Sequence, residues 1–598
     1  MASTAITFVD YIIFGLFLFI SVAVGAYHAI KARIDAKKSA GGATANFLIG
    51  GRKMPTIPTA LSLLTTFLSG ITLLGAPAET YQRGLLFWVV YLSSTIAFLL
   101  TAVFFVPVIY KQAPISVYEY FQYRFDSPLL RKIAAGLFLV NTIFYMSVVM
   151  YAPSVALSGV TGVPVWPFIL AVGVASTFYT TIGGLKAVVW TDTVQAVFMY
   201  AGVFTLIIKG TIDVGGLSRI FEISGELHRL ESLKRLNPTL AQHNSIWIGI
   251  FGGVAYWMSM YGLNQMALQR YCSLPSLKHV NLVIGITVPA FVVLGTLACF
   301  IGMVALAYFY HCDPITTGEV KTLDQLAILF AVKVLAVVPG LPGLFLACLF
   351  GGTLSTISSG MNSMAAVAWE DLIKQHVKLD DSKAVLLNKA LVTSFGVLAT
   401  AMAFLCESLG GIINSFVSVL GTLAGPLVGL FFLGILFPRA TKLGAFVALI
   451  ISEAFALWIC LGNFLQQPYK YYIIDTNTTC AHNTTVTTKF FPPDVDLHFG
   501  DPDVFVLYRI SPWAYGLIGI ALVQLIGIPV SLLTPKSMKY DTPNHHALTY
   551  CGRDEPLEDF HLKKESVVER RVPNYKRSSQ QRAEAEPLNL SDNPGRQD

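Results

Sequence analysis

Long apolar stretches recur along the chain and are separated by short polar turns. Most of them approach or exceed the ~20 residues that a helix needs to cross a hydrocarbon core. Thirteen membrane-spanning helices are predicted, at residues 9–30, 55–75, 84–110, 132–158, 164–184, 188–209, 245–270, 279–309, 341–368, 386–408, 411–437, 441–463 and 511–534. Little chain remains for a soluble domain, so the function must reside among the helices.

Two further segments are not interpreted as spans. The run at 323–337 is apolar, but Lys333 interrupts it and "PGLPG" follows it, so we expect an interfacial helix. Residues 211–244 carry mixed charge with a helical period and are expected to form an extracellular loop. If 323–337 crossed the membrane, every later segment would change sides.

Composition excludes several classes of protein. Hydrophobic residues make up 54% of the 598 positions and charged residues only 13%, which is too apolar for a soluble globular protein. The formal charge of +6 is small for this length and does not indicate a nucleic-acid surface. The sequence contains no GxxxxGK[ST] or HExxH motif, so we expect neither an enzyme nor a cofactor. We expect a multi-pass, all-α protein of the lipid bilayer.

The charged turns give an orientation. The first apolar run lacks a basic region before it and is followed by Lys31, Arg33, Lys37 and Lys38, which indicates a first span with the N-terminus outside. A cleaved signal peptide does not fit this pattern. Basic residues dominate most of the turns that this orientation places in the cytoplasm.

Glycosylation sequons provide an independent check on the topology. Asn477 and Asn483 lie in the loop 464–510, which thirteen spans place outside the cell. The sequon at Asn589 falls in the tail 535–598, which is predicted to be cytoplasmic and disordered apart from local docking. That third site should therefore stay unmodified.

Polar residues interrupt two of the predicted spans. The second span contains Thr65, Thr66, Ser69 and Gly70 near its middle, and the seventh has Gly262, Asn264 and Gln265 in a similar place. A helix can break in a membrane only where protein or water satisfies its backbone. Five spans separate the two breaks, as in two inverted five-helix repeats, although close packing of small residues is the alternative.

The repeats imply a division of the chain. It comprises the N-terminus, first span and cytoplasmic loop (1–54), the first repeat (55–210), the extracellular loop (211–244), the second repeat (245–437), the last two spans (438–534) and the tail (535–598).

Hydroxyl groups gather on one face of the ninth span, in "FGGTLSTISSGMN". Gly352, Ser355, Thr356 and Ser359 follow a helical spacing. A small, hard cation prefers oxygen ligands, and hydroxyls and free carbonyls supply them without a buried carboxylate. We expect a sodium site between this face and the broken second span, with small-residue packing as the alternative.

Acidic residues inside the spans are few. Asp192 lies at the cytoplasmic start of the sixth span, where it could guide a released cation or complement a helix N-terminus. Glu453 lies within the twelfth span and requires a partner that the sequence does not identify. Cys312 and Cys480 both fall outside in this topology and are candidates for a disulfide, with unpaired thiols as the alternative.

Four ordered motifs carry a family resemblance: "FLIGGRKM" (47–54), "GGLKAVVWTDTVQA" (183–196), "YGLNQMALQRY" (261–271) and "GTLSTISSGMNSMAAVAWEDLI" (352–373). They resemble the sodium:solute symporter family. Within it, the chain is similar to the branch of monocarboxylate, multivitamin and iodide transporters, and most similar to the sodium-coupled monocarboxylate transporters. The resemblance implies two inverted five-helix repeats in a core like that of sodium-coupled amino acid transporters, with flanking helices.

The resemblance also implies functional residues. Sodium would bind the side chains of Ser355 and Thr356 and the carbonyls of Thr65, Leu68 and Gly352, and Asp192 would lie on its inner exit path. The implied substrate residues are Ser69, Thr72, Tyr261, Asn264 and Gln265. Threonine at position 72 is typical of monocarboxylate symporters, whereas iodide and sugar symporters typically have glutamine there.

We therefore expect a plasma-membrane symporter that imports sodium with a small organic anion, such as lactate, pyruvate, a short-chain fatty acid or nicotinate, by alternating access. The C-terminus is expected in the cytoplasm. The alternatives are a multivitamin or iodide symporter and a sodium-linked sensor or channel. The solute, the stoichiometry and the oligomeric state stay open at this point.

Overall fold

The computed structural model describes residues 6–36, 43–112, 114–234, 236–408, 412–469, 501–535 and 548–550. Helix accounts for 82% of these residues, and they contain no strand. The all-helical prediction is therefore confirmed for the described part of the chain.

Ten helical segments are long and apolar enough to cross a membrane. They contain α1 (Phe8–Ala36), α5 (Trp88–Leu100), α8 (Pro128–Thr161), α9 (Val165–Val214), α13 (Leu277–Tyr308), α15 (Leu341–Val367), α16 (Asp381–Ala403), α17 (Ile412–Leu436), α18 (Lys442–Gln466) and α19 (Tyr515–Leu533). A bent pair, α3 (Thr56–Phe67) and α4 (Gly70–Arg83), raises the number to eleven if it forms one span. Shorter helices connect them: α2 (Ala43–Ile49), α6 (Val106–Lys111), α7 (Glu119–Phe125), α10 (Leu217–Glu226), α11 (Gly253–Tyr261), α12 (Gln265–Ser273) and α14 (Leu326–Leu335).

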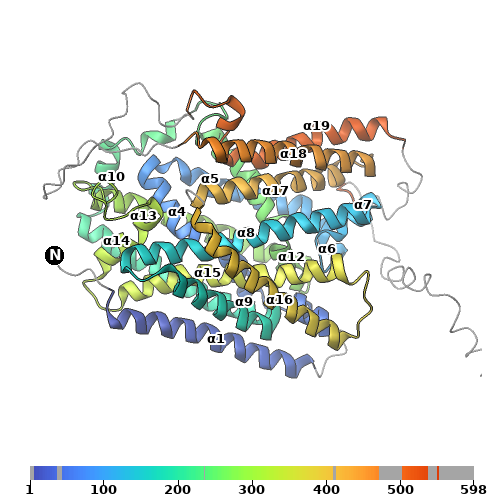
Figure 1. Cartoon of the computed structure of the whole chain (residues 1–598), viewed down its shortest axis with the longest axis horizontal. Helices are drawn as coiled ribbons and strands as arrows, with labels where there is room; N and C mark the ends of the chain where they lie inside the picture. The colour runs from blue at the N-terminus through green and yellow to red at the C-terminus, as the bar shows by residue number, and fades with distance from the viewer. Residues whose placement is uncertain are drawn as a thin grey trace, which may run out of the picture.

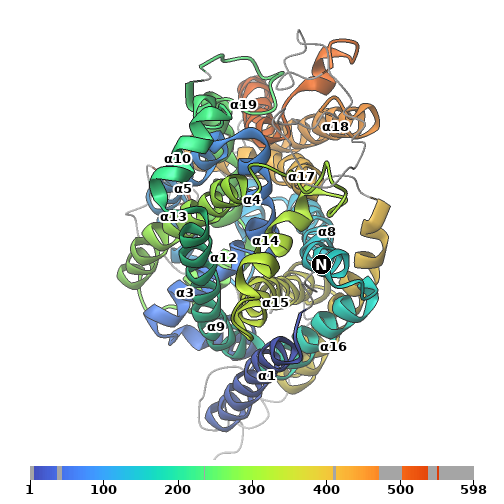
Figure 2. The ribbon, with the colours of Figure 1, turned by 90° about the vertical axis from the view of Figure 1, so that its left-hand side faces the viewer.

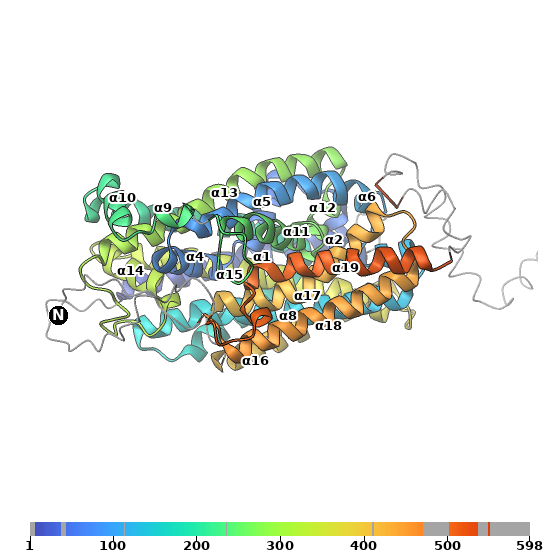
Figure 3. The same ribbon diagram turned by 90° about the horizontal axis from the view of Figure 1, so that it is seen from above.

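The long helices run alongside one another along the longest axis of the molecule (Figure 1). Seen end-on, α1 lies at one edge and α18 and α19 lie at the opposite edge (Figure 2). Helix α15 lies among the others. In its most apolar stretch 89% of the residues are buried, whereas the corresponding share in α1 is 22%. Helices α10 and α14 lie at one end of the bundle and α6 at the other (Figure 3). The helix that carries the hydroxyl face is thus the core of the fold.

Helix α9 reverses direction at Gly184. This glycine has φ 59° and ψ −156°, a conformation that disfavours residues with a Cβ. Later residues of each half meet earlier residues of their partner helix: Gly173 faces Thr400 and Thr181 bonds to Thr393 in α16, whereas Gln195 lies against Gly351 and Gly202 faces Cys348 in α15. Because α15 and α16 form a hairpin, the two halves of α9 are antiparallel. They coincide with the two separate segments predicted at 164–184 and 188–209.

The segment predicted to be an interfacial helix, 323–337, does not cross the bundle. Helix α14 has only ten residues, too few to span a bilayer, and nine of them are buried. It packs against α4, α9 and α15. The segment is therefore an interior packing element at one end of the bundle.

Helices α17 and α19 pack closely through small residues, because Gly421, Gly425 and Gly429 recur at every fourth position of α17. A Cβ added to Gly425 would lie 2.7 Å from the Cα of Gly516, and one added to Gly429 would lie 2.9 Å from the Cβ of Val523. Larger side chains at these positions would push the two helices apart.

Three residues of the tail dock on the cytoplasmic end of the predicted topology. The Tyr120 hydroxyl donates to the Leu548 carbonyl (3.2 Å), and the Tyr550 amide donates to the Ile435 carbonyl (2.9 Å). The Tyr550 ring lies 4.9 Å from that of Phe104, centroid to centroid. The described part of the tail thus makes the local docking contact that was expected.

Candidate functional site

The break between α3 and α4 lies in the middle of the predicted second span. Helix α3 ends at Phe67, Leu68 leaves the helical region (φ −95°, ψ 83°), and Ser69 is extended. The Thr66 hydroxyl donates to the Ser62 carbonyl one turn earlier, which occupies a backbone acceptor near the break. The two half-helices meet at 55°. Backbone carbonyls near the end of α3 are thereby released from the regular helical pattern.

Helix α15 approaches this break through Gly352. A Cβ at Gly352 would lie 3.0 Å from the Leu68 carbonyl oxygen, so only glycine permits this separation without a shift. The Thr356 hydroxyl lies 2.9 Å from the Thr66 carbonyl oxygen and 3.0 Å from the Gly352 carbonyl oxygen. Three backbone oxygens and one hydroxyl therefore gather between α15 and the break.

A second hydroxyl contact joins the same two helices. The Ser355 hydroxyl donates to the Thr65 hydroxyl at 2.9 Å, and both residues are fully buried. The structure thus brings all five predicted sodium residues together, with Thr66 as an additional neighbour that the sequence reasoning missed. The carbonyl closest to Thr356 is that of Thr66, whereas Thr65 makes its contact through its hydroxyl.

Tyr145 of α8 is a further residue that the sequence did not identify. Its side chain is 3% exposed, and its hydroxyl lies beside the hydroxyls of both Ser69 and Thr356. It therefore connects a predicted substrate residue to a predicted sodium ligand. The sequence offered no signal that distinguished it from Tyr151 in the same apolar span.

Replacing Tyr145 with phenylalanine should raise the sodium concentration for half-maximal uptake several-fold, because the ring stays while the hydroxyl beside Ser69 and Thr356 is lost. Sodium titration of initial uptake rates measures this. Tyr200→Phe is the matched control, since the Tyr200 hydroxyl donates only to the Ala290 carbonyl, outside the site. An unchanged sodium titration in Tyr145→Phe would show that the hydroxyl does not link the two sites.

The second break lies between α11 and α12 and faces the first. Tyr261, at the end of α11, is fully buried, and its ring lies 4.7 Å from that of Phe67 and 3.8 Å from that of Phe98. Asn264 caps α12, because its side-chain oxygen accepts from the Met266 amide (2.9 Å). The two broken segments therefore meet through aromatic packing.

The other predicted substrate residues differ in their surroundings. Thr72 lies one turn beyond Ser69, is half-buried and is close to the Tyr91 hydroxyl. Gln265 instead contacts the segment after α6: it donates to the Ile115 carbonyl (2.6 Å) and accepts from the Val117 amide (2.9 Å). Ser69, Thr72 and Tyr261 thus lie around the two breaks, whereas Gln265 holds α12 to a neighbouring loop.

Asp192 forms a buried ion pair below the hydroxyl face. Its Oδ2 lies 3.0 Å from Nη2 of Arg270, and both side chains are fully buried. Asp192 also accepts from the Ser62 hydroxyl, and its carboxylate lies beside Ser355. Arg270 donates in addition to the hydroxyls of Ser62 (2.8 Å) and Ser359 (2.6 Å). The ion pair on the predicted exit path is therefore tied to the hydroxyl face through Ser359.

Further contacts close the bundle on the α12 side of this ion pair. The Gln269 side chain accepts from Asn362 (3.0 Å) and Ser363 (2.9 Å) near the end of α15. Arg131 of α8 donates to Asp371 at 2.5 Å. Because these contacts join α12 to α15 and α8 to the end of α15, they must change if this end of the site opens.

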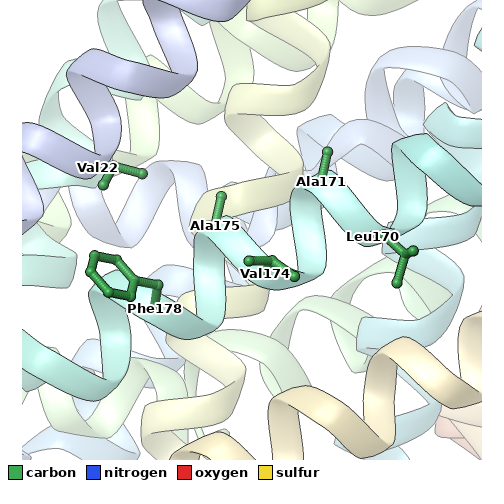
Figure 4. A pocket seen from close by; sticks show the side chains of 6 residues that line it. All are labelled: Val22, Leu170, Ala171, Val174, Ala175 and Phe178. Carbon is green, nitrogen blue, oxygen red and sulfur yellow. The ribbon is translucent and has the colours of Figure 1, made fainter.

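A cavity of about 550 Å³ between α1 and the first half of α9 has a different chemistry (Figure 4). Its labelled lining consists of six hydrocarbon side chains, among them Val22, Val174 and Phe178. Val174 is 66% exposed and Phe178 is 53% exposed. The cavity is an apolar groove on the outer face and offers no group to orient a carboxylate.

Several predicted positions add no contact to the site. Glu453 is 7% exposed, and neither carboxylate oxygen has a hydrogen-bond partner in the described structure.

Cys312 is disulfide-bonded. Its predicted partner Cys480 and the sequons Asn477 and Asn483 lie outside the described residues. Among the residues that the structure describes, no group of three His, Cys, Asp or Glu side chains could hold a metal.

Comparison with known proteins adds to this geometry. The profile described as the sodium:solute symporter family matches residues 47–452. The chain belongs to the sodium:solute symporter family. Its motifs, both helix breaks and the hydroxyl face all lie within the matched residues.

Curated relatives within this family are similar over most of their length. The human sodium-coupled monocarboxylate transporter 2 is 36% identical over 535 residues, which cover 89% of this chain and 85% of the relative. The human sodium-coupled monocarboxylate transporter 1 is 36% identical over 88% of this chain and 87% of the relative. The rabbit (Oryctolagus cuniculus) sodium-dependent multivitamin transporter is 36% identical over 89% and 83%. Since these relatives are sodium-coupled transporters, the chain is a transporter and not an enzyme.

Solved structures show that the fold is that of membrane transporters. A substrate-bound, outward-open Na⁺-coupled sialic acid symporter matches with a TM-score of 0.73 at 21% identity, covering 89% of this chain and 99% of that chain. The nucleobase-cation-symport-1 transporter Mhp1 in a closed conformation matches with a TM-score of 0.51 at 13% identity, covering 83% and 97%. At these identities the likeness shows the fold alone.

Proposed function

We propose that this protein imports sodium together with a small monocarboxylate across the plasma membrane. The observation that carries the proposal is the oxygen-lined contact between α15 and the break in α3–α4, linked through Tyr145 to Ser69. Its similarity to sodium-coupled monocarboxylate transporters supports the choice of solute.

In this proposal, sodium binds at the contact itself. The ligands are the hydroxyls of Ser355 and Thr356 and the carbonyls of Thr65, Leu68 and Gly352. Neutral oxygens suit a hard monovalent cation, because they add no fixed negative charge to the buried site. Bound sodium would replace hydrogen bonds that now join α15 to α3 and would hold the break in place.

The carboxylate of the solute binds beside the break. The N-terminus of α4 presents backbone N–H groups and the positive end of a helix dipole. Ser69 and Thr72 add hydroxyl donors, Tyr261 packs against the non-polar part of the solute, and Asn264 and Gln265 complete the predicted set. Sodium on the adjacent face favours the bound anion electrostatically, which couples the two ligands.

The transport cycle rests on the proposed topology. Of thirteen spans, with the N-terminus outside and the C-terminus inside, ten form two inverted repeats, 55–210 and 245–437, which alternate access to the site. Sodium leaves inward past Asp192. Each inward sodium charge is worth about 2.3 kcal/mol per 100 mV, so more than one sodium per monoanion would make import electrogenic and concentrative.

A competition experiment tests the choice of solute. Lactate, nicotinate, biotin, iodide and glucose are applied in turn to cells expressing the protein, and sodium-driven current and labelled uptake are recorded. We expect lactate or nicotinate to compete for sodium-driven transport and glucose to have no effect on it. Competition by biotin or iodide alone would contradict the monocarboxylate assignment and favour the multivitamin or iodide alternative.

The same recording tests the alternative of a sodium-linked sensor or channel. A symporter accumulates the solute whenever it carries current. Ligand-evoked current without accumulation of label would contradict symport.

A further inference from the structure

Three ionisable side chains share a nearly closed space at the end of α4. Arg83 Nε lies 3.7 Å from Oε2 of Glu79, one turn earlier on the helix. His243 Nε2, from the segment before α11, lies 3.4 Å from the same oxygen. The Arg83 side chain is 10% exposed, Glu79 13% and His243 3%.

These side chains line a small cavity together with Asn244. Its volume is about 10 Å³, roughly the space that one water-sized particle needs. A molecule that carries a carboxylate does not fit. Thr72 lies eleven residues before Arg83, or about 16 Å along the helix, so the cavity is separate from the proposed solute site.

Two hydrogen-bond donors in the cavity have no acceptor. Arg83 Nε and Nη1 are buried and make no hydrogen bond. The side-chain oxygen of Asn244 also makes none, and its amide can turn to present a donor. Buried donors without an acceptor are costly, because they have lost their water. A small particle that only accepts hydrogen bonds would satisfy these groups.

The charge of the cluster depends on His243. Glu79 and Arg83 cancel, so the cluster is neutral with a neutral imidazole and carries one positive charge with a protonated one. Tyr469 faces His243, with ring centroids 5.1 Å apart, and Arg509 lies beyond it, its carbonyl accepting from the Tyr469 hydroxyl (2.6 Å). Burial raises the pKa of Tyr469, which therefore stays neutral. Glu79 is thus the anionic group that opposes Arg83, Arg509 and a protonated His243.

We propose that this cavity binds one monatomic anion of the halide class, held by Arg83 and protonated His243 with Asn244 as a neutral donor. The site goes beyond the proposed transport function, and only its extracellular position rests on the proposed topology. There it would bind chloride from the medium more tightly as the medium becomes acidic. Glu79 opposes binding, so its removal should strengthen the site.

Thermal denaturation of the purified full-length protein tests this proposal. Sodium is held constant in the absence of any carboxylate, and chloride replaces methanesulfonate stepwise at pH 6 and at pH 8. An anion that binds only the folded protein raises the midpoint, and the stabilisation grows with the logarithm of 1 + [anion]/Kd. We expect a higher apparent chloride affinity at pH 6 than at pH 8, because protonation of His243 would add a positive charge to the cavity. Bromide should substitute for chloride and sulfate should not.

Substitutions at this site should change the chloride response in opposite directions. Arg83→Gln and His243→Gln should lose the chloride response at pH 6, whereas Glu79→Gln should respond at pH 8 as strongly as the wild type does at pH 6. Arg219→Gln, which removes an exposed arginine paired with Glu222, is the matched control and should behave as wild type.

An equal chloride response in Arg83→Gln and the wild type would overturn the site, since it would reduce the effect to general salt stabilisation. A weaker response in Glu79→Gln would also overturn it, and this arm decides if Arg83→Gln does not fold. Because no transport is measured, failure here is distinguishable from failure of the proposed function.

Discussion

Replacing Ser355 and Thr356 together with alanine is expected to abolish sodium-dependent uptake while leaving the protein at the cell surface. The substitution removes both side-chain ligands of the proposed sodium site and leaves three carbonyls, too few to replace the hydration shell of the ion. Initial uptake with and without sodium measures the loss, and surface biotinylation measures the amount of protein. The expected residual uptake equals that of untransfected cells.

Ser176→Ala is the control for loss of a buried hydroxyl. Ser176 is fully buried in α9, and its hydroxyl bonds to the Val172 and Gly173 carbonyls of its own helix. It should retain sodium-dependent uptake. Unchanged sodium dependence in the double variant would show that sodium binds elsewhere.

Arg270→Gln is expected to have the largest effect on stability. It leaves the Asp192 carboxylate fully buried without its cationic partner, and breaking such a pair costs about 3–5 kcal/mol. We expect a thermal midpoint several degrees lower in detergent and a reduced amount at the surface. The hydrogen bonds to Ser62 and Ser359 are lost with the same substitution.

The double variant Asp192→Asn, Arg270→Gln separates charge from packing. It removes the unpaired charge while keeping side chains of similar size, so it should regain at least half of the lost stability. The matched control is Arg219→Gln, since Arg219 is exposed and should change nothing. A single Arg270→Gln variant as stable as the wild type would contradict the buried ion pair.

The breaks were predictable because they are local. Threonines followed by Ser69 and Gly70 disfavour a regular helix in lipid, and Gly262 and Asn264 do the same in the seventh segment. The hydroxyl face followed from helical period alone, since Gly352, Ser355, Thr356 and Ser359 must share one side of α15. The reversal at Gly184 coincides with the boundary between two apolar runs.

The partners across helices could not be predicted from one sequence. Arg270 stood within a quoted motif, but nothing local indicated that α12 would place it beside Asp192. The same holds for Tyr145, whose hydroxyl lies beside residues more than seventy positions before it and two hundred after it in the chain. For Gln265 the sequence prediction and the contacts differ. Its position at the second break indicated the substrate site, whereas its side chain bonds to the loop at Ile115 and Val117.

The central claim is that sodium drives uphill movement of a monocarboxylate through this protein. Purified protein is reconstituted into liposomes, an inward sodium gradient is imposed, and labelled lactate or nicotinate is followed inside. We predict transient accumulation above the external concentration, abolished by potassium in place of sodium and by a sodium ionophore. The account would be contradicted if the labelled solute only reached the external concentration and did not exceed it, whether or not a sodium gradient is present.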